Sequence, residues 1–179
     1  MSNLLMMHKD VHLFGGRKMN IVGYDSASYT EGPGIRVAVW VSGCIHHCKG
    51  CFNASYFDPD KGTPFSEKHL DKILQDLDNN YIDGISFLGG EPLAPYNVEG
   101  ILSVMREIRK KFGDKKTILV YTGYVLEELP IWVRAQVECL ADMLIDGRYE
   151  KDLPTKKPFR GSDNQCFYVK KDGIWHKVD

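Results

Sequence analysis

The chain has 179 residues, of which 43% are hydrophobic and 26% are charged, a composition typical of one globular domain. Its 23 Lys and Arg residues nearly balance its 24 Asp and Glu residues, which leaves no basic field for nucleic acid or for an anionic membrane surface. The apolar runs are too short to span a bilayer, and charged residues follow Leu4–Met7 closely, so we expect a cytoplasmic protein without a signal peptide.

The chain is expected to be one domain over residues 19–179. Residues 1–18 show no clear periodicity, so they are expected to form a loose N-terminal extension. Four short apolar segments are predicted as strands, at residues 35–41, 85–88, 117–121 and 143–145. Residues 166–169 and 174–178 flank a Lys-Asp-Gly turn and are predicted to form a terminal hairpin.

Helices are predicted between these strands. The first begins at the N-cap Ser66 and fades at Asn79. The second has an apolar face over residues 98–108 and stops at Gly113, and a third, broken helix covers residues 126–138. Alternating strands and helices indicate right-handed βαβ units and a parallel sheet.

Each of the four strands is followed by small or polar residues, and in parallel α/β folds the chemistry gathers at the carboxyl ends of strands. The four segments are Gly43-Cys44, Gly89-Gly90-Glu91, Thr122-Gly123-Tyr124 and Asp146-Gly147-Arg148. A complete eight-stranded barrel takes about 250 residues. The predicted fold class is therefore α/β, either a partial (β/α) barrel or an open, curved, mostly parallel sheet.

Three of the five cysteines, Cys44, Cys48 and Cys51, lie within eight residues. An odd and crowded set argues against a disulfide scaffold and favours metal ligands. Three thiolates in one loop can hold three irons of a [4Fe-4S] cluster and leave the fourth iron open to an external ligand. Cys139 and Cys166 stand alone and are expected to be small buried residues.

A structural zinc site is the alternative for the cysteine loop, with His46 or His47 as the fourth ligand. Zinc motifs usually join two separated ligand pairs, and the sequence has no second pair. We therefore favour the cluster and expect His46 and His47 to be loop or partner-facing residues.

The tetrapeptide Gly89-Gly90-Glu91-Pro92 follows the strand at residues 85–88. Glycines there would let a ligand approach the backbone, and Glu91 could accept charge-assisted hydrogen bonds from an ammonium group. The same residue types in this order also occur in common turns. The position, one βα unit after the cysteine loop, favours a binding role.

The cysteine loop together with this tetrapeptide resembles the radical S-adenosylmethionine superfamily. Glu31–Arg36, which reads EGPGIR, is similar to the activases of glycyl radical enzymes. Residues 121–124, 144–148 and 160–165, the last reading RGSDNQ, resemble the activating proteins of anaerobic (class III) ribonucleoside-triphosphate reductases of the short bacterial and phage type.

This resemblance implies the roles of several residues. Cys44, Cys48 and Cys51 would hold the cluster, whose open iron binds the amino and carboxylate groups of S-adenosylmethionine. Contacts to this cofactor would come from two further segments, Gly50-Cys51-Phe52 and Gly90-Glu91.

The resemblance also implies the reaction and the partners. One electron from the reduced cluster would cleave S-adenosylmethionine to a 5′-deoxyadenosyl radical, which takes a hydrogen atom from a glycine of the reductase. A low-potential donor such as flavodoxin would supply the electron. Arg160–Gln165 and the hairpin would organise the face that receives the reductase, or would only order the C-terminus.

Two other functions stay open on the sequence. One is activation of a different glycyl radical enzyme, such as pyruvate formate-lyase, although those activases are generally longer and RGSDNQ argues against them. The other is a non-enzymatic iron–sulfur electron carrier, which would need neither an open iron nor the Gly89–Pro92 turn.

Overall fold

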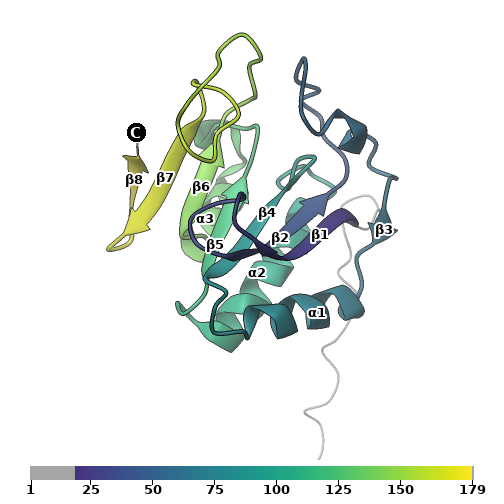
Figure 1. Ribbon diagram of the computed structural model, residues 1–179, viewed down its shortest axis with the longest axis vertical. Helices are drawn as coiled ribbons and strands as arrows, with labels where there is room; N and C mark the ends of the chain where they lie inside the picture. The colour runs from purple at the N-terminus through teal and green to yellow at the C-terminus, as the bar shows by residue number, and fades with distance from the viewer. Residues whose placement is uncertain (1–18, 179) are drawn as a thin grey trace, which may run out of the picture.

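A computed structural model describes residues 19–178, so the predicted extension over residues 1–18 lies outside the described residues (Figure 1). The described chain folds into one eight-stranded sheet with three α-helices. The strands are β1 Asn20–Ser28, β2 Arg36–Val41, β3 Thr63–Pro64, β4 Gly84–Gly89, β5 Thr117–Tyr121, β6 Met143–Asp146, β7 Cys166–Lys171 and β8 Ile174–Val178. The helices are α1 Glu67–Leu77, α2 Val98–Phe112 and α3 Ile131–Leu140, with short 3-10 turns η2 Ala54–Tyr56 and η3 Leu126–Glu128.

The strand order is β3-β1-β2-β4-β5-β6-β7-β8, and the sheet is open rather than closed. The four predicted strands β2, β4, β5 and β6 are parallel neighbours, as expected. The prediction of a mostly parallel sheet is nevertheless wrong, because both flanks pair in antiparallel fashion and the sheet is mixed. Only seven residues join β1 to β2, too few for the crossover that a parallel pair requires.

All three helices cover one face of the sheet (Figure 1). Their apolar faces pack on the inward side chains of the central strands, and this side contains most of the core. The opposite face carries a smaller cluster of buried residues from β5, β6 and β7, namely Leu119, Met143, Ile145 and Phe167. Helix α1 follows Ser66, and α2 ends at Gly113, as the sequence predicted.

Strand β1 was not predicted from the sequence. Its residues, NIVGYDSAS, mix polar and apolar types without a clean alternation, and its pairing with β2 contains two register irregularities. The lone cysteines also differ from expectation: Cys139 is exposed on α3 and Cys166 is only partly buried at the start of β7. No helix in the described residues is long and apolar enough to cross a membrane.

The amino ends of the parallel strands are tied together by Arg36, whose side chain is fully buried. Its guanidinium donates to the Ser86 hydroxyl at 2.8 Å, to the Ile85 carbonyl at 2.6 Å, and to both the hydroxyl and the carbonyl of Thr117 at 2.9 and 3.0 Å. A further bond goes to the carbonyl of Pro33 at 3.1 Å. Burial lowers the pKa of Arg36 to about 10. The last residue of the EGPGIR motif is therefore a clamp at the edge opposite the cysteines.

Candidate active site

The loops after β2, β4, β5 and β6 all leave the same edge of the sheet, at the top of Figure 1. This is the arrangement that the parallel pairing predicts, because the carboxyl ends of parallel strands share one edge. All the predicted site residues belong to these loops. The edge is therefore the candidate active site.

The cysteine loop is fixed at its start by backbone hydrogen bonds. Gly43 donates to the carbonyl of Tyr56 at 2.7 Å, and Cys44 donates to that of Phe57 at 3.2 Å. Cys44 is buried, whereas Cys48 and Cys51 are partly buried. Burial raises the pKa of the Cys44 and Cys51 thiols, and the nearby Cys48 raises both further. The three thiols are thus close enough to interact electrostatically.

The zinc alternative needs a histidine ligand, and neither histidine is placed for that role. The Nε2 atom of His46 lies 2.9 Å from a carboxylate oxygen of Glu91, while the His47 ring stacks on Phe57 at 4.6 Å. Among the described residues, no group of three or more His, Cys, Asp or Glu side chains is arranged to hold a metal ion.

The turn after β4 lies directly against the cysteine loop. Glu91 donates its backbone N–H to the carbonyl of Gly43 at 2.7 Å, and Gly90 donates to Val41 at 2.7 Å. A Cβ atom at Gly90 would collide with the backbone of Gly43. Glycine at this position is therefore required for packing of the two loops, beyond any approach of a ligand.

The Glu91 side chain is buried and its carboxylate accepts four hydrogen bonds from the protein. The donors are the N–H groups of Leu93 at 2.9 Å and Gly123 at 2.7 Å, the Thr122 hydroxyl at 2.8 Å and the His46 ring at 2.9 Å. The sequence predicted that this carboxylate faces an ammonium group. In the structure its acceptor positions are filled by the segments that follow β4 and β5 and by the cysteine loop.

Gly50 and Phe52 lie where the cysteine loop meets the loop that follows β6. The side-chain stem of Lys151 lies over Gly50, and the exposed Phe52 ring is 5.0 Å from the ring of Tyr149. The structure thus brings the predicted residues Cys44, Cys48, Gly50, Cys51, Phe52, Gly90 and Glu91 to one edge.

Residues 160–165, the RGSDNQ motif, bind the turn after β6 through their side chains. Asn164 donates to the carbonyl of Arg148 at 2.8 Å, Gln165 donates to that of Gly147 at 2.8 Å, and Ser162 accepts from the N–H of Glu150 at 3.0 Å. These bonds support the interpretation of the motif as a polar turn that orders the C-terminal part. The motif thereby orders the turn whose residues Tyr149 and Lys151 contact the cysteine loop.

Asn97, which the sequence analysis did not select, is a buried link in the site. Its amide donates to the carbonyls of Ser42 at 2.8 Å and Glu91 at 3.0 Å, so it connects the loops after β2 and β4. The available signal was its position directly before the apolar helix at residues 98–108, which is typical of an N-cap. Its side chain instead bonds across to another loop.

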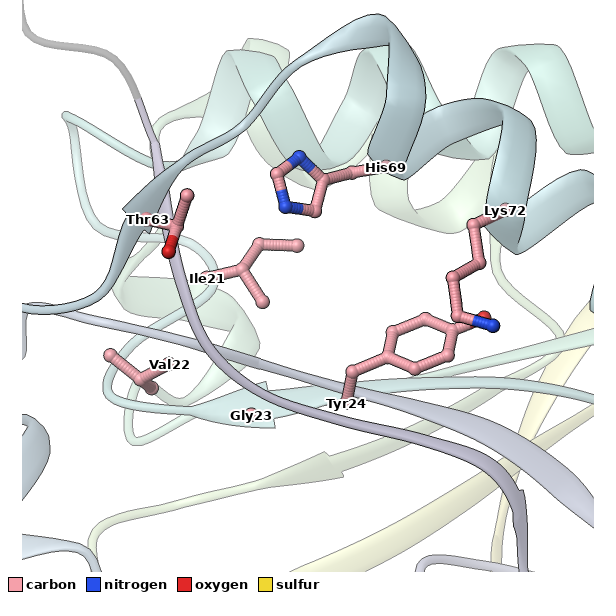
Figure 2. Close-up of a pocket in the computed structure, with 7 residues that line it drawn as sticks. All are labelled: Ile21, Val22, Gly23, Tyr24, Thr63, His69 and Lys72. Carbon is pink, nitrogen blue, oxygen red and sulfur yellow. The ribbon is translucent and has the colours of Figure 1, made fainter.

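A cavity of about 260 Å³ lies elsewhere, between β1 and α1 (Figure 2). It is lined by Ile21, Val22, Gly23, Tyr24, Thr63, His69 and Lys72. Two of its polar groups, the hydroxyl of Tyr24 and the ammonium of Lys72, both bond to Asp76. The cavity contains none of the predicted site residues.

Comparison with known proteins gives a consistent result. The 4Fe-4S single cluster domain family matches residues 30–168. An anaerobic ribonucleoside-triphosphate reductase-activating protein from Enterobacteria phage T4 is 40% identical over 149 residues, which are 82% of this chain and 92% of that protein. The protein of the same name from Escherichia coli K12 is 41% identical over 155 residues, or 84% and 98% of the two chains. That from Vibrio cholerae is 34% identical over 153 residues, or 84% and 97%.

Proposed function

Since the chain belongs to the family of anaerobic ribonucleoside-triphosphate reductase-activating proteins, which are activases with a 4Fe-4S cluster domain, we propose that Cys44, Cys48 and Cys51 hold the cluster and that its open iron binds S-adenosylmethionine. The observation that carries this proposal is the placement of three cysteines in one loop at the carboxyl edge of the parallel strands, directly against the Gly89–Pro92 turn. The remaining cysteines lie on α3 and β7, outside this loop.

The donor set fits a cluster with one open iron. Three thiolates bind three irons, and neither histidine of the loop is directed to supply a fourth ligand. When bound, the cluster would supply one electron that breaks a C–S bond of S-adenosylmethionine, which would release methionine and a 5′-deoxyadenosyl radical able to take a hydrogen atom from a glycine of the reductase. The protein's own part is to fix the thiols, orient the cofactor and exclude water.

Contacts to S-adenosylmethionine are proposed to come from Gly50, Cys51 and Phe52 on one side and from Gly90 and Glu91 on the other. Because the carboxylate of Glu91 already accepts four protein hydrogen bonds, its turn would contact the methionine amino group through backbone carbonyls. The exposed ring of Phe52 offers an apolar surface beside the cysteines.

The finer description of the fold and the partners is part of the same proposal. The open mixed sheet would be a partial barrel of the radical S-adenosylmethionine type, in one domain over residues 19–179. A glycine-bearing loop of the anaerobic reductase would close its open side, and a low-potential donor such as flavodoxin would reduce the cluster. We propose a cytoplasmic protein without nucleic-acid or membrane partners.

The test is cofactor cleavage by the anaerobically purified protein. With a reductant, the wild-type protein should convert S-adenosylmethionine to 5′-deoxyadenosine and methionine, and Cys48→Ala should not. A simple iron–sulfur electron carrier would contain the cluster but form no 5′-deoxyadenosine. A colourless protein loaded with zinc would contradict the proposal.

A further inference from the structure

His46 belongs to the cysteine loop, but its side chain is directed into the protein and is only 3% exposed. Its ring packs edge-on against Tyr124 at a centroid distance of 4.6 Å, and a Cβ atom at Gly123 would collide with the ring. The sequence analysis expected a loop or partner-facing residue. His46 does lie in a loop, but its side chain is enclosed by the segment that follows β5 and faces the protein interior.

The hydrogen bond from His46 to Glu91 joins two buried groups. The Glu91 side chain is 1% exposed, and an ionised carboxylate can only accept, so the imidazole donates through its Nε2–H. The other three donors to this carboxylate come from the segments that follow β4 and β5, namely Leu93, Thr122 and Gly123. Only the fourth donor, His46, comes from the loop that carries the cysteines.

The cysteine loop is held firmly on either side of this segment. Gly43 accepts from the N–H of Glu91 before the first cysteine, and the Asn53 side chain donates to the carbonyl of Gly89 at 3.2 Å after the third. Between these anchors, the side chain of His46 joins residues 45–50 to the edge of the sheet through its hydrogen bond with Glu91. Without this bond, the position of Cys48 would depend on the backbone of a loop that is mostly exposed.

We propose that His46 is a positioning residue, which through the buried carboxylate of Glu91 holds the middle of the cysteine loop in register with the Gly89–Pro92 turn. This inference rests on the proposed function, because it concerns how the cluster ligands and the cofactor-binding turn are kept at a fixed separation. It assigns to Glu91 the role of a scaffold shared by three loops. Loss of the His46 donor leaves a buried carboxylate with an unfilled acceptor site and lets the loop move.

The experiment compares three variants with the wild-type protein. His46→Ala removes the donor and the ring, whereas His46→Gln restores an N–H at the position of Nε2. His47→Asn is the matched control, since His47 lies in the same loop with φ of 48°, a conformation that asparagine tolerates. The measurements are iron content, affinity for S-adenosylmethionine by anaerobic calorimetry, and the change in the electron paramagnetic resonance spectrum of the reduced cluster when the cofactor is added.

We expect His46→Ala to weaken cofactor binding about tenfold or more and to alter the spectrum, His46→Gln to recover most of both, and His47→Asn to match the wild type. Adding Glu91→Ala to His46→Ala should cost less than the two single changes together, because either change alone removes the contact between these side chains. If His46→Ala loads no cluster, recovered iron content in His46→Gln supports the role, and equal loss in both overturns it.

Wild-type affinity and spectrum in a fully loaded His46→Ala protein would also overturn the positioning role. Failure of the wild-type protein itself to bind S-adenosylmethionine would instead contradict the proposed function, so the two failures are distinct.

Discussion

Replacement of Arg36 tests whether the EGPGIR motif stabilises the sheet rather than taking part in the chemistry. Arg36→Ala removes five hydrogen bonds and a fully buried side chain at the amino ends of β2, β4 and β5. Each hydrogen bond to a charged group contributes about 1.5–3 kcal/mol in isolation, but these values are not additive. The cost of stripping the charge of water offsets part of them, as the lowered pKa of Arg36 shows.

We therefore expect Arg36→Ala to lower the free energy of unfolding by about 3–5 kcal/mol, because it opens a cavity and leaves buried carbonyl and hydroxyl groups without a donor. With an m-value of about 2 kcal/mol/M, a loss of about 4 kcal/mol lowers the urea midpoint by roughly 2 M. Arg36→Met keeps much of the volume without the donors, so it should recover only the part due to the cavity.

The assay is urea unfolding of the cluster-free protein, followed by circular dichroism. Arg106→Ala is the control, because this exposed arginine makes one side-chain bond, to Gln136, and its loss should cost less than about 0.5 kcal/mol. A difference below about 1 kcal/mol between Arg36→Ala and the control would refute the reasoning. Wild-type stability of Arg36→Met would show that the volume of the side chain, and not its hydrogen bonds, stabilises the sheet.

Three further predictions concern other parts of the chain. Replacing any one cluster cysteine with Ala should abolish stable iron loading, whereas Cys139→Ala should keep the wild-type iron content; loss of iron in the latter would contradict the ligand assignment. A chain that begins at Met19 should fold and cleave S-adenosylmethionine normally, since residues 1–18 show no periodicity that would bury them and Met19 lies in the core of the described residues; insolubility on truncation would contradict this. Burial raises the pKa of Asp146, so stability is lost as the pH rises through that pKa. The free energy of unfolding of Asp146→Asn relative to the wild type should therefore increase as the pH rises above about 4, the ordinary pKa of an aspartate, and a flat difference would contradict the shift.

The central strands and helices could be predicted because their apolar patterns are unambiguous. The segment at residues 35–41 is almost entirely buried in β2, and the helical spacing from Val98 to Ile108 corresponds to the buried face of α2. Strand β1 could not be predicted, because it lies near an edge, pairs irregularly with β2 and carries a mixed sequence. Its antiparallel direction follows from the short connection between β1 and β2. No local sequence pattern specifies the path of that connection.

The sequence was sufficient to predict which loops form the site, but not which side chains bond to one another there. The spacing of Cys44, Cys48 and Cys51 and the position of the Gly89–Pro92 turn both pointed to the edge where the structure places them. The role of His46 could not be predicted from the sequence, since its partner Glu91 is 45 residues away and the residues that enclose its ring lie in the segment after β5. Such contacts depend on the register of β2, β4 and β5, which a single sequence does not fix.

The most direct measurement mixes this protein anaerobically with the cognate anaerobic ribonucleoside-triphosphate reductase, S-adenosylmethionine and a reductant, and records the electron paramagnetic resonance spectrum. The account predicts the doublet of a glycyl radical on the reductase, and no doublet when Cys48→Ala replaces the wild-type protein. Cleavage of the cofactor without a radical on the reductase, but with one on a different glycyl radical enzyme, would contradict it.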